Sequence, residues 1–430
     1  MEKIVNKSKI LNFSNILKLE SLFPILVFAS ILEFPAPAAA LSWSDVQSKS
    51  LATAPDLQLA RTNVTYADDA VDTAKASFYP TISSSITAGR AVDSAAKKSS
   101  NTYGAGVSVE QNLYSSGRDT AKVNAANSAR AAASKDEKNA SVTLRAKLAR
   151  AWNNAVYYHE LSKIRLRNIT RSESNAKIVG LRYSNGRENK GSVLKSESQT
   201  LEAKLGDAEA SEKFTLAKGA LSLLIGQPIA DHEPIVGPLL NMVVAKQKEA
   251  VLPMVAAKQA ALQASVDSLA LARIQYLPTL GLSATAHKSA SPDLPLLAPV
   301  YSAQLALNIP IFNAATSAGV RSAVTKTAAA TLELSAAKLA QEQAIKTTLS
   351  AFEFAVKRRA IAKKNFEASE LLGEISRQRY ALGLGSFQDW NNYEIEFMQS
   401  EAEVLTSEKS AADALCDYHE QIGVTLEETL

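Results

Sequence analysis

The longest stretch of helix-forming residues in the chain is 115–183, which reads SSGRDTAKVNAANSARAAASKDEKNASVTLRAKLARAWNNAVYYHELSKIRLRNITRSESNAKIVGLRY. It contains no proline and, after Gly117, a single glycine, Gly180. Ala, Lys, Arg, Glu and Leu dominate it, and these residues lose little freedom in a helix. At about 1.5 Å per residue this helix would be on the order of 100 Å long. One globular core cannot cover such a rod, so other segments must pack along it.

Apolar residues recur along this helix at spacings of three and four, on two separate faces. A helix with two apolar faces, here called seams, is expected to pack against one helix on each side. The first seam comprises Leu144, Leu148, Ala151, Ala155 and Tyr158, the second Val142, Ala149, Trp152 and Val156, and a similar row in the second half of the chain Ile345, Leu349, Phe352 and Val356.

Two segments upstream of the long helix alternate between apolar and small or polar residues, at 81–90 and 103–110. This period of two indicates β-strands, and the polar stretch between them reads as a loop. The pair predicts a β-hairpin whose strands, of roughly ten residues, are long enough to cross a bilayer when tilted.

The chain then repeats its own pattern roughly 200 residues later, as repeat architectures do. Tyr79-Pro80-Thr81 returns as Leu277-Pro278-Thr279, and Arg182-Tyr183 returns as Arg379-Tyr380. Each half therefore reads as helix, β-hairpin, long helix, tight turn and returning helix. In the first half the opening helix is expected to run unbroken from Ser42 to about Ser77.

The predicted organisation follows from this repeat. In the first half, the two shorter helices together match the long one, so the shorter helices are expected to stack end to end beside it. The expected segments are a signal peptide at 1–40, a first repeat at 41–228 (β-hairpin 79–113, long helix 115–182, returning helix 193–225), a connector at 229–250, a second repeat at 251–424 (β-hairpin 278–311, long helix 314–380, returning helix 389–422) and a tail at 425–430.

Residues 1–40 have the features of an export signal. Lysines precede an apolar run, 22–34, and Ala38 and Ala40 occupy the small-residue positions of a cleavage site. We expect cleavage after Ala40; a short signal-anchor is the alternative. No later run is long and apolar enough to predict a membrane-spanning helix.

Composition argues against several classes of function. Charged residues are 21% and the formal net charge is +4, so no strong field marks nucleic acid as a partner. The single cysteine, Cys416, excludes an intrachain disulfide, and the four histidines share no ligand-like spacing. No catalytic, cofactor or metal site is predicted, and the chain is not expected to be an enzyme.

Four membrane-length strands are too few for a closed barrel, since single-chain barrels start at about eight strands. An open sheet in lipid would leave unpaired backbone groups, each costing several kcal/mol. If these strands span a membrane, several copies must contribute to one barrel. A small exposed β-domain on a helical stalk is the alternative.

Over residues 42–424 the sequence resembles the TolC family of outer-membrane efflux proteins. The resemblance rests on the repeat and on the motifs Phe78-Tyr79-Pro80-Thr81-Ile82, Tyr276-Leu277-Pro278-Thr279-Leu280, Gln111-Asn112-Leu113-Tyr114-Ser115-Ser116-Gly117 and Leu223-Leu224-Ile225-Gly226-Gln227-Pro228. It implies a mainly α fold with a membrane β-barrel portion, formed by a homotrimer whose twelve strands close one barrel in the outer membrane. It also implies a coiled-coil helical barrel that extends into the periplasm.

The function implied by this resemblance is passive conduction through the exit duct of a tripartite efflux system. A periplasmic adaptor and an inner-membrane pump, proton-driven or ATP-driven, would be the partners. Two alternatives stay open: the exit duct of a type I protein secretion system, and a periplasmic coiled-coil scaffold without a pore.

The same resemblance places a gate at the turns 183–192 and 380–389. Matching positions are Tyr380, Asp389, Ser192, Gly186, Gly383 and Asn392, with Arg187 and Lys190 as candidate adaptor contacts. The family's gate arginine falls on Gly385, so a hydrogen bond from Tyr380 to Ser192 or to backbone is the expected latch, worth about 1 kcal/mol. Ser192 also fits an N-cap, and Asp389 fits a capping box with Ser386.

Overall fold

The computed structural model describes residues 41–93, 98–230, 233–235, 237–239, 252–290 and 298–427. The expected signal peptide, most of the connector and the end of the tail lie outside these residues. Within them the chain forms seven helices and four strands: α1 Trp43–Thr53, α2 Pro55–Ala76, β1 Thr81–Asp93, β2 Lys98–Tyr114, α3 Arg118–Ser184, α4 Lys190–Ile225, α5 Pro253–Ile274, β3 Thr279–Ala290, β4 Val300–Asn308, α6 Ala314–Ala381 and α7 Phe387–Gln421.

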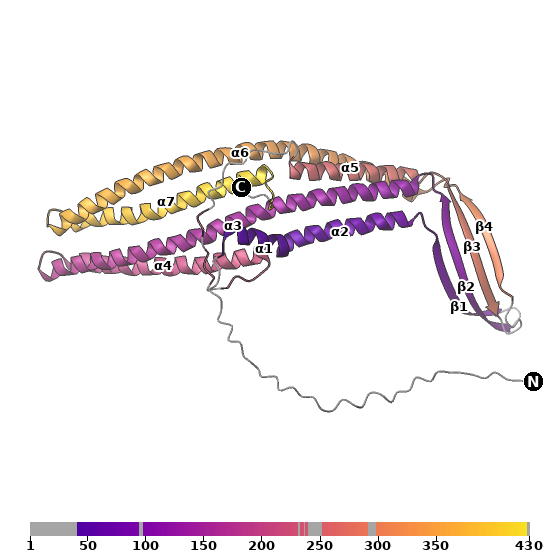
Figure 1. Ribbon diagram of the computed structural model, residues 1–430, viewed down its shortest axis with the longest axis horizontal. Coiled ribbons are helices and arrows are strands. Elements are labelled where there is room, and N and C mark those ends of the chain that lie inside the picture. Colours follow the sequence, from indigo (N-terminus) through magenta and orange to yellow (C-terminus); the bar gives the residue numbers. More distant parts are fainter. Residues whose placement is uncertain are drawn as a thin grey trace, which may run out of the picture. The chain divides into compact units, whose positions relative to one another are not determined.

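The two long helices, α3 with 67 residues and α6 with 68, both extend from the sheet to the helical turns, and α5 and α7 lie between them (Figure 1). The sheet lies at one end of the helices and both helical turns lie at the other. Near the turns the helices are neighbours in the order α4, α3, α7, α6; near the sheet the order is α2, α3, α5, α6. Helix α3 therefore has neighbours on both sides, as its two apolar seams predict.

The shorter helices stack end to end beside the long ones, as expected. Helix α4 ends at Gly226, and the Thr53 hydroxyl at the end of α1 donates a hydrogen bond of 2.7 Å to the carbonyl of Ile225. In the second half Gly423, just after α7, lies against Pro253, the first residue of α5. Both glycines have positive φ, near 80°, and a Cβ at either would lie 2.5 Å from the abutting segment.

The prediction of one unbroken helix from Ser42 to Ser77 is wrong. Ala54 has extended geometry, with φ −58° and ψ 121°, and separates α1 from α2. The cause is Pro55, which disfavours helical geometry in the residue before it and is well placed at the start of a new helix. Ser42 and Asp45 form a capping box at the start of α1.

A hydrophobic core forms where these helix ends meet α3. Leu148 and Trp152 of α3 pack there against Leu57 of α2 and against Leu221 and Ile225 of α4, and all five side chains are at most 1% exposed. Burying side chains of this size stabilises the fold by about 1.5–3 kcal/mol each. The core therefore fixes the point along α3 at which α2 gives way to α4.

The four strands form one antiparallel sheet in the order β1-β2-β3-β4. Thr81 pairs with Glu110, Ser108 with Thr285, and Thr279 with Asn308. The predicted fold class, long helices with four strands in a two-fold repeat, is confirmed. None of the helices described here combines the length and apolar character needed to cross a membrane.

Candidate functional site

The sheet has one apolar and one polar face. Because side chains alternate along a strand, the register places Ile82, Ile86 and Val107 on one face with Leu282 and Leu305. The opposite face carries hydroxyls, glycines and polar groups, among them Ser83, Ser108, Glu110, Thr285, Ser302 and Gln304. The apolar side chains are exposed, and Ile86 is 90% exposed. This alternation is typical of strands that face lipid on one side and water on the other.

At the far end of the helices the two turns come together. We call the segment 183–192 the first tip and the segment 380–389 the second tip. Val179 and Val193, from either side of the first tip, pack with Tyr380 and Trp390, from either side of the second. The rings of Tyr380 and Trp390 stack with their centroids 4.5 Å apart and their planes at 15°. The second tip is therefore packed directly onto the first.

Tyr380 forms polar contacts to the first tip although it is only 1% exposed. Its hydroxyl donates a 2.8 Å hydrogen bond to Glu188. Its carbonyl accepts a 2.6 Å hydrogen bond from Arg182, whose guanidinium also lies 4.5 Å from the centre of the tyrosine ring. Burial and the bond to Glu188 raise the pKa of the Tyr380 hydroxyl well above its usual value. The hydroxyl is therefore protonated and able to donate over the physiological pH range.

Glu188 is the shared acceptor of this cluster. One carboxylate oxygen accepts from Tyr380, and the other accepts from the Ser192 hydroxyl at 2.9 Å and from the Asn189 backbone at 3.1 Å. Partial burial alone would raise the pKa of Glu188, but these hydrogen bonds and the charge of Arg182 outweigh it, so the pKa is lowered. Glu188 is therefore ionised at neutral pH and holds both tips.

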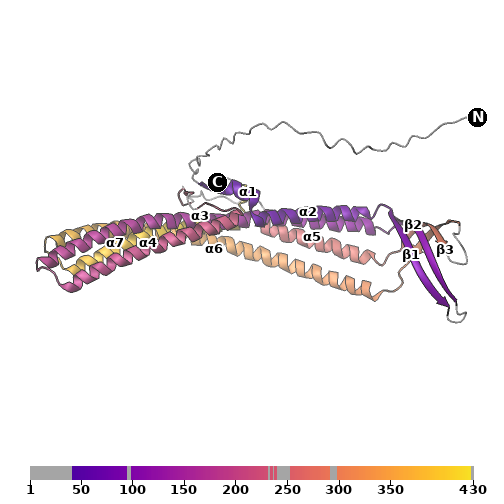
Figure 2. The same ribbon diagram turned by 90° about the horizontal axis from the view of Figure 1, so that it is seen from below.

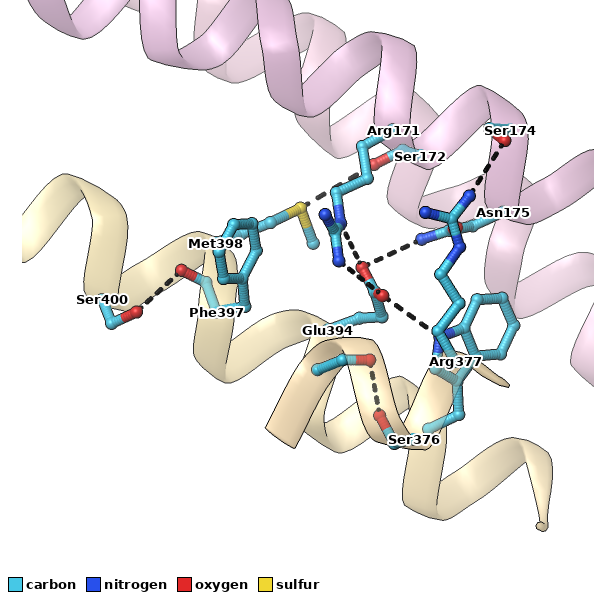
Figure 3. A network of polar contacts seen from close by, with 12 residues as sticks. Arg171, Ser172, Ser174, Asn175, Ser376, Arg377, Glu394, Phe397, Met398 and Ser400 are labelled. Atoms are coloured by element: carbon cyan, nitrogen blue, oxygen red, sulfur yellow. Dashed lines mark hydrogen bonds and ion pairs between the residues drawn. The ribbon is translucent and has the colours of Figure 1, made fainter. Parts of the chain in front are cut away.

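A second polar cluster joins α3 to α7 just above the tips (Figure 3). Glu394, 3% exposed, accepts hydrogen bonds from Arg171 Nε at 2.6 Å and Nη2 at 2.9 Å. Asn175 and the Trp390 indole each donate to the same carboxylate at 3.1 Å. The bond to Glu394 is the main reason that the pKa of Arg171 is raised. We call Arg171, Asn175, Trp390 and Glu394 the α3–α7 clamp.

The structure changes the expected latch. Ser192 does not bond to Tyr380; both donate to Glu188. Ser192 is also not the N-cap of the returning helix. Asn189 takes that role, because its side chain accepts from the Ser192 backbone at 2.9 Å, and α4 therefore begins at Lys190 instead of 193. Ser192 is 6% exposed on the first turn of α4.

The remaining candidate residues lie around the tips. Ser386 is the N-cap of α7: its hydroxyl oxygen accepts from the Asp389 backbone at 3.1 Å and its hydroxyl donates to the Asp389 carboxylate at 2.7 Å, which is half of the expected capping box. Asn392 accepts from Gln388 at 3.0 Å on the next turn of α7. Gly186 and Gly383 occupy equivalent turn positions and have φ values of 68° and 80°. None of these contacts reaches the Tyr380–Glu188 bond.

Arg187 and Lys190 lie on the exposed surface of the first tip. The ammonium of Lys190 lies 5.7 Å from the ring centre of Tyr183, the counterpart of Tyr380 in the first repeat. The two tyrosines therefore differ in environment: Tyr183 is 44% exposed, whereas Tyr380 is buried.

Sequence reasoning missed Glu188, Arg182 and the α3–α7 clamp. Their partners are far apart in the chain, and no local motif links Arg171 to Glu394. The repeat gives a weak signal for Glu188. Glu188 occupies the position in the first tip that corresponds to Gly385 in the second tip, where the family's gate arginine falls. In the described part of the chain, no three His, Cys, Asp or Glu side chains cluster as metal ligands would.

Comparison with solved structures shows the class of fold. The chain superposes on the Campylobacter jejuni CmeC outer membrane channel with a TM-score of 0.77 and 16% identity, covering 90% of this chain and 87% of that one. The Vibrio cholerae outer membrane protein VceC superposes with a TM-score of 0.76 and 17% identity, covering 89% of this chain and 96% of that one. The open state of the Neisseria gonorrhoeae MtrE outer membrane channel superposes with a TM-score of 0.75 and 20% identity, covering 88% of each chain. The fold is that of outer-membrane channels.

A family model described as outer membrane efflux protein matches residues 46–227 and 246–417. The chain belongs to this family of channel proteins, which are not enzymes, and it is an outer-membrane protein whose helices extend into the periplasm. A search of curated proteins finds no match.

Proposed function

We propose that three copies of this chain form the exit duct of a tripartite efflux system. The duct conducts small molecules passively from an inner-membrane pump and a periplasmic adaptor to the outside. Family membership supports efflux through the outer membrane. The trimer, the adaptor and the pump are inferences that rest on the geometry and on this family relationship.

The amphipathic open sheet is the observation that carries the proposal. Among the described strands, β1 pairs only with β2 and β4 only with β3, so both edges offer unpaired backbone groups. Such edges are not tolerated in lipid, and a closed barrel removes them. Three copies supply twelve strands, a number within the range of outer-membrane barrels. The apolar face would then contact lipid and the polar face would line the pore.

The tips are the proposed gate of this duct. Tyr380 and Glu188 tie the second tip to the first within one protomer, and the α3–α7 clamp holds the helices behind them. Release of the Tyr380–Glu188 bond would let α6 and α7 move away from α3 and widen the periplasmic end. Asp389 and Asn392, both on α7, would move with them and flank the entrance.

The exposed charges of the first tip fit contact with an adaptor. Arg187 and Lys190 project from the turn, and neither forms a salt bridge with the described residues. Rim charges of this kind mainly set the association rate and the salt dependence of binding.

The size of the purified protein tests the proposal. Protein extracted from outer membranes in mild detergent should have, by light scattering, three times the mass of the mature chain. A stable monomer in the outer-membrane fraction would contradict the three-copy duct.

A further inference from the structure

Two cations, Arg90 and Lys288, lie on the apolar face of the sheet. Arg90 shares its face of β1 with Ile86, and Lys288 shares its face of β3 with Leu282, because side chains alternate along a strand. Both cations are exposed. They are the only Lys or Arg residues in four stretches of the strands: 81–90, 99–114, 279–290 and 300–308. A cation that faces the middle of a bilayer is strongly destabilising, whereas one at the interface is tolerated, so the depth of both residues decides their role.

Both cations lie near the strand ends that are far from the helices (Figure 2). Arg90 follows Thr81, the start of β1, and Lys288 follows Thr279, the start of β3, by about nine residues, or roughly 30 Å of strand. At the tilt of about 35–45° that outer-membrane strands have, this length spans roughly 20–25 Å of the membrane, close to the apolar band of about 25 Å. Because the helices extend into the periplasm, the cations lie at the outer edge of that band.

Tyr103 of β2 lies between the two cations on the same face. The register pairs Tyr103 with Ala88 of β1 on one side and with Ala290 of β3 on the other. Arg90 and Lys288 are each two residues from these partners and are therefore diagonal neighbours of Tyr103. Diagonal neighbours are within reach of aromatic and long side chains. The ring of Tyr103 is 56% exposed between them.

A second tyrosine continues the row onto β4. Tyr301 pairs with Ala286 of β3, two residues from Lys288, and is 76% exposed. Each strand thus contributes one residue to a diagonal row in which cations and tyrosines alternate. We call Arg90, Tyr103, Lys288 and Tyr301 the outer row.

The outer row runs parallel to the helix-side edge of the sheet. At that edge β1 begins at Thr81, which pairs with Glu110 of β2, whereas β3 reaches Leu280, which pairs with Tyr114. The edge therefore moves by about two residues per strand between β1 and β3, and the outer row moves by the same amount in the same direction. Its four residues consequently lie at one depth in the membrane.

The chain leaves both cations of the outer row able to bind an external anion. Arg90 donates one hydrogen bond, of 3.3 Å, to the Ser99 hydroxyl. Among the described residues, no carboxylate forms an ion pair with Arg90 or with Lys288. On the helix side of the row the same face is apolar and carries the exposed side chains of Ile86 and Val107. Positive charge therefore borders an apolar surface, which is the complement of an anionic lipid.

We propose that Arg90 and Lys288 bind the phosphate groups of lipids in the outer leaflet of the outer membrane. This inference rests on the proposed duct, in which the apolar face of the sheet contacts lipid. The guanidinium and the ammonium donate charge-assisted hydrogen bonds to phosphate. Tyr103 and Tyr301 place their rings at the membrane surface, where aromatic girdles of outer-membrane barrels lie. The acyl chains extend from there along Ile86 and Val107.

Native mass spectrometry with two matched lipids tests the inference. Protein extracted in mild detergent and freed of lipid is mixed with dioleoyl phosphatidic acid, or with dioleoylglycerol, which has the same chains and no phosphate. The unmodified protein should bind phosphatidic acid more tightly. Arg90→Gln/Lys288→Gln should weaken this binding about 30-fold, because each cation near a membrane surface contributes roughly a fivefold gain. The binding of dioleoylglycerol should not change.

Two further sets of variants complete the test. Lys195→Gln/Lys326→Gln removes the same two charges from exposed positions on α4 and α6 and should leave both affinities unchanged. The single variants Arg90→Gln and Lys288→Gln should each lose about fivefold in phosphatidic acid binding. They keep the inference testable if the double variant does not assemble.

Unchanged binding of phosphatidic acid in Arg90→Gln/Lys288→Gln would overturn the site. An equal loss in Lys195→Gln/Lys326→Gln would also overturn it, because binding would then follow net charge. Displacement of bound phosphatidic acid by an equal concentration of inorganic phosphate would overturn the assignment to lipid.

Light scattering on the same samples separates this inference from the duct. A trimer that binds the two lipids equally would overturn the phosphate site and leave the three-copy duct standing. A monomer that prefers phosphatidic acid through Arg90 and Lys288 would support the site and contradict the duct.

Discussion

The Tyr380 hydroxyl donates a 2.8 Å hydrogen bond to Glu188 and so connects the end of α6 to the turn between α3 and α4. The two residues are almost two hundred positions apart, yet each lies at the tip of its own helical hairpin. Because the ring of Tyr380 also stacks on Trp390, the polar bond and the apolar packing hold the same two segments together.

Replacing Tyr380 by Phe should increase leak through the duct. The variant keeps the stacked ring and removes a hydrogen bond to an ionised carboxylate, worth about 1.5–3 kcal/mol, which corresponds to a shift of about 10- to 150-fold of each latch toward release. Conductance in planar bilayers without adaptor or pump measures the effect. Tyr183→Phe, at the exposed counterpart in the first repeat, is the control and should leave the leak unchanged. Equal leak in both variants would remove Tyr380 from the gate.

Acid should release the same latch. The hydrogen bonds that Glu188 accepts hold its pKa below the ordinary glutamate value. The stabilisation of the latch by ionised Glu188 is therefore complete above the ordinary glutamate pKa of about 4.3. This stabilisation is lost as the pH falls through the lowered pKa of Glu188. Leak conductance should rise on acidification below about pH 4.

Glu188→Gln separates this group from other carboxylates that titrate in acid. The amide cannot ionise, so leak should already be raised at pH 7 and should depend less on pH than in the unmodified protein. A variant whose leak rises with acid as steeply as the original would show that another group controls the response.

The α3–α7 clamp should contribute strongly to stability. Arg171→Met leaves the Glu394 carboxylate buried without its cation, and breaking a buried pair in this way costs about 3–5 kcal/mol. Urea denaturation in detergent, followed by helical circular dichroism, measures the loss. Arg171→Met/Glu394→Leu should recover much of it, because no buried charge remains, and Arg187→Met at the exposed first tip is the control. If the double variant were less stable than the single one, the buried charge would not be the cause.

Gly226→Ala should destabilise the junction between α4 and α1. The residue has φ 79°, and a Cβ there would lie 2.5 Å from the Thr53 carbonyl oxygen. The backbone strain alone costs about 1–2 kcal/mol. Gly180→Ala, inside α3 with open space around it, should be neutral or stabilise by up to about 1 kcal/mol. A measured order in which Gly180→Ala is the more harmful would contradict the end-to-end stacking.

Features that depend on local chemistry could be predicted from the sequence. The period of two at 81–90, the long helical run at 115–183 and the repeat of Tyr79-Pro80-Thr81 each report a backbone preference within a short window. The break at Ala54 could also have been found, because Pro55 restricts its predecessor. It was missed because the apolar spacing continues across the break.

The contacts of the tips could not be predicted in the same way. The resemblance placed Tyr380 at a tip, but it could not supply Glu188 as the acceptor, because the partner depends on how two hairpins from different repeats pack. The same holds for Arg171 and Glu394, which meet only after α3 and α7 lie side by side. The N-cap of α4 was placed at Ser192 because Asn189 and Ser192 are both good capping residues, and local pattern alone does not rank them.

Single-channel recording in planar bilayers tests the central claim most directly. Purified wild-type protein should insert and produce discrete, ion-conducting steps, and Tyr380→Phe should increase their conductance or open time. Protein that is folded and trimeric by light scattering but produces no steps, with or without Tyr380→Phe, would contradict the claim that this chain forms a duct.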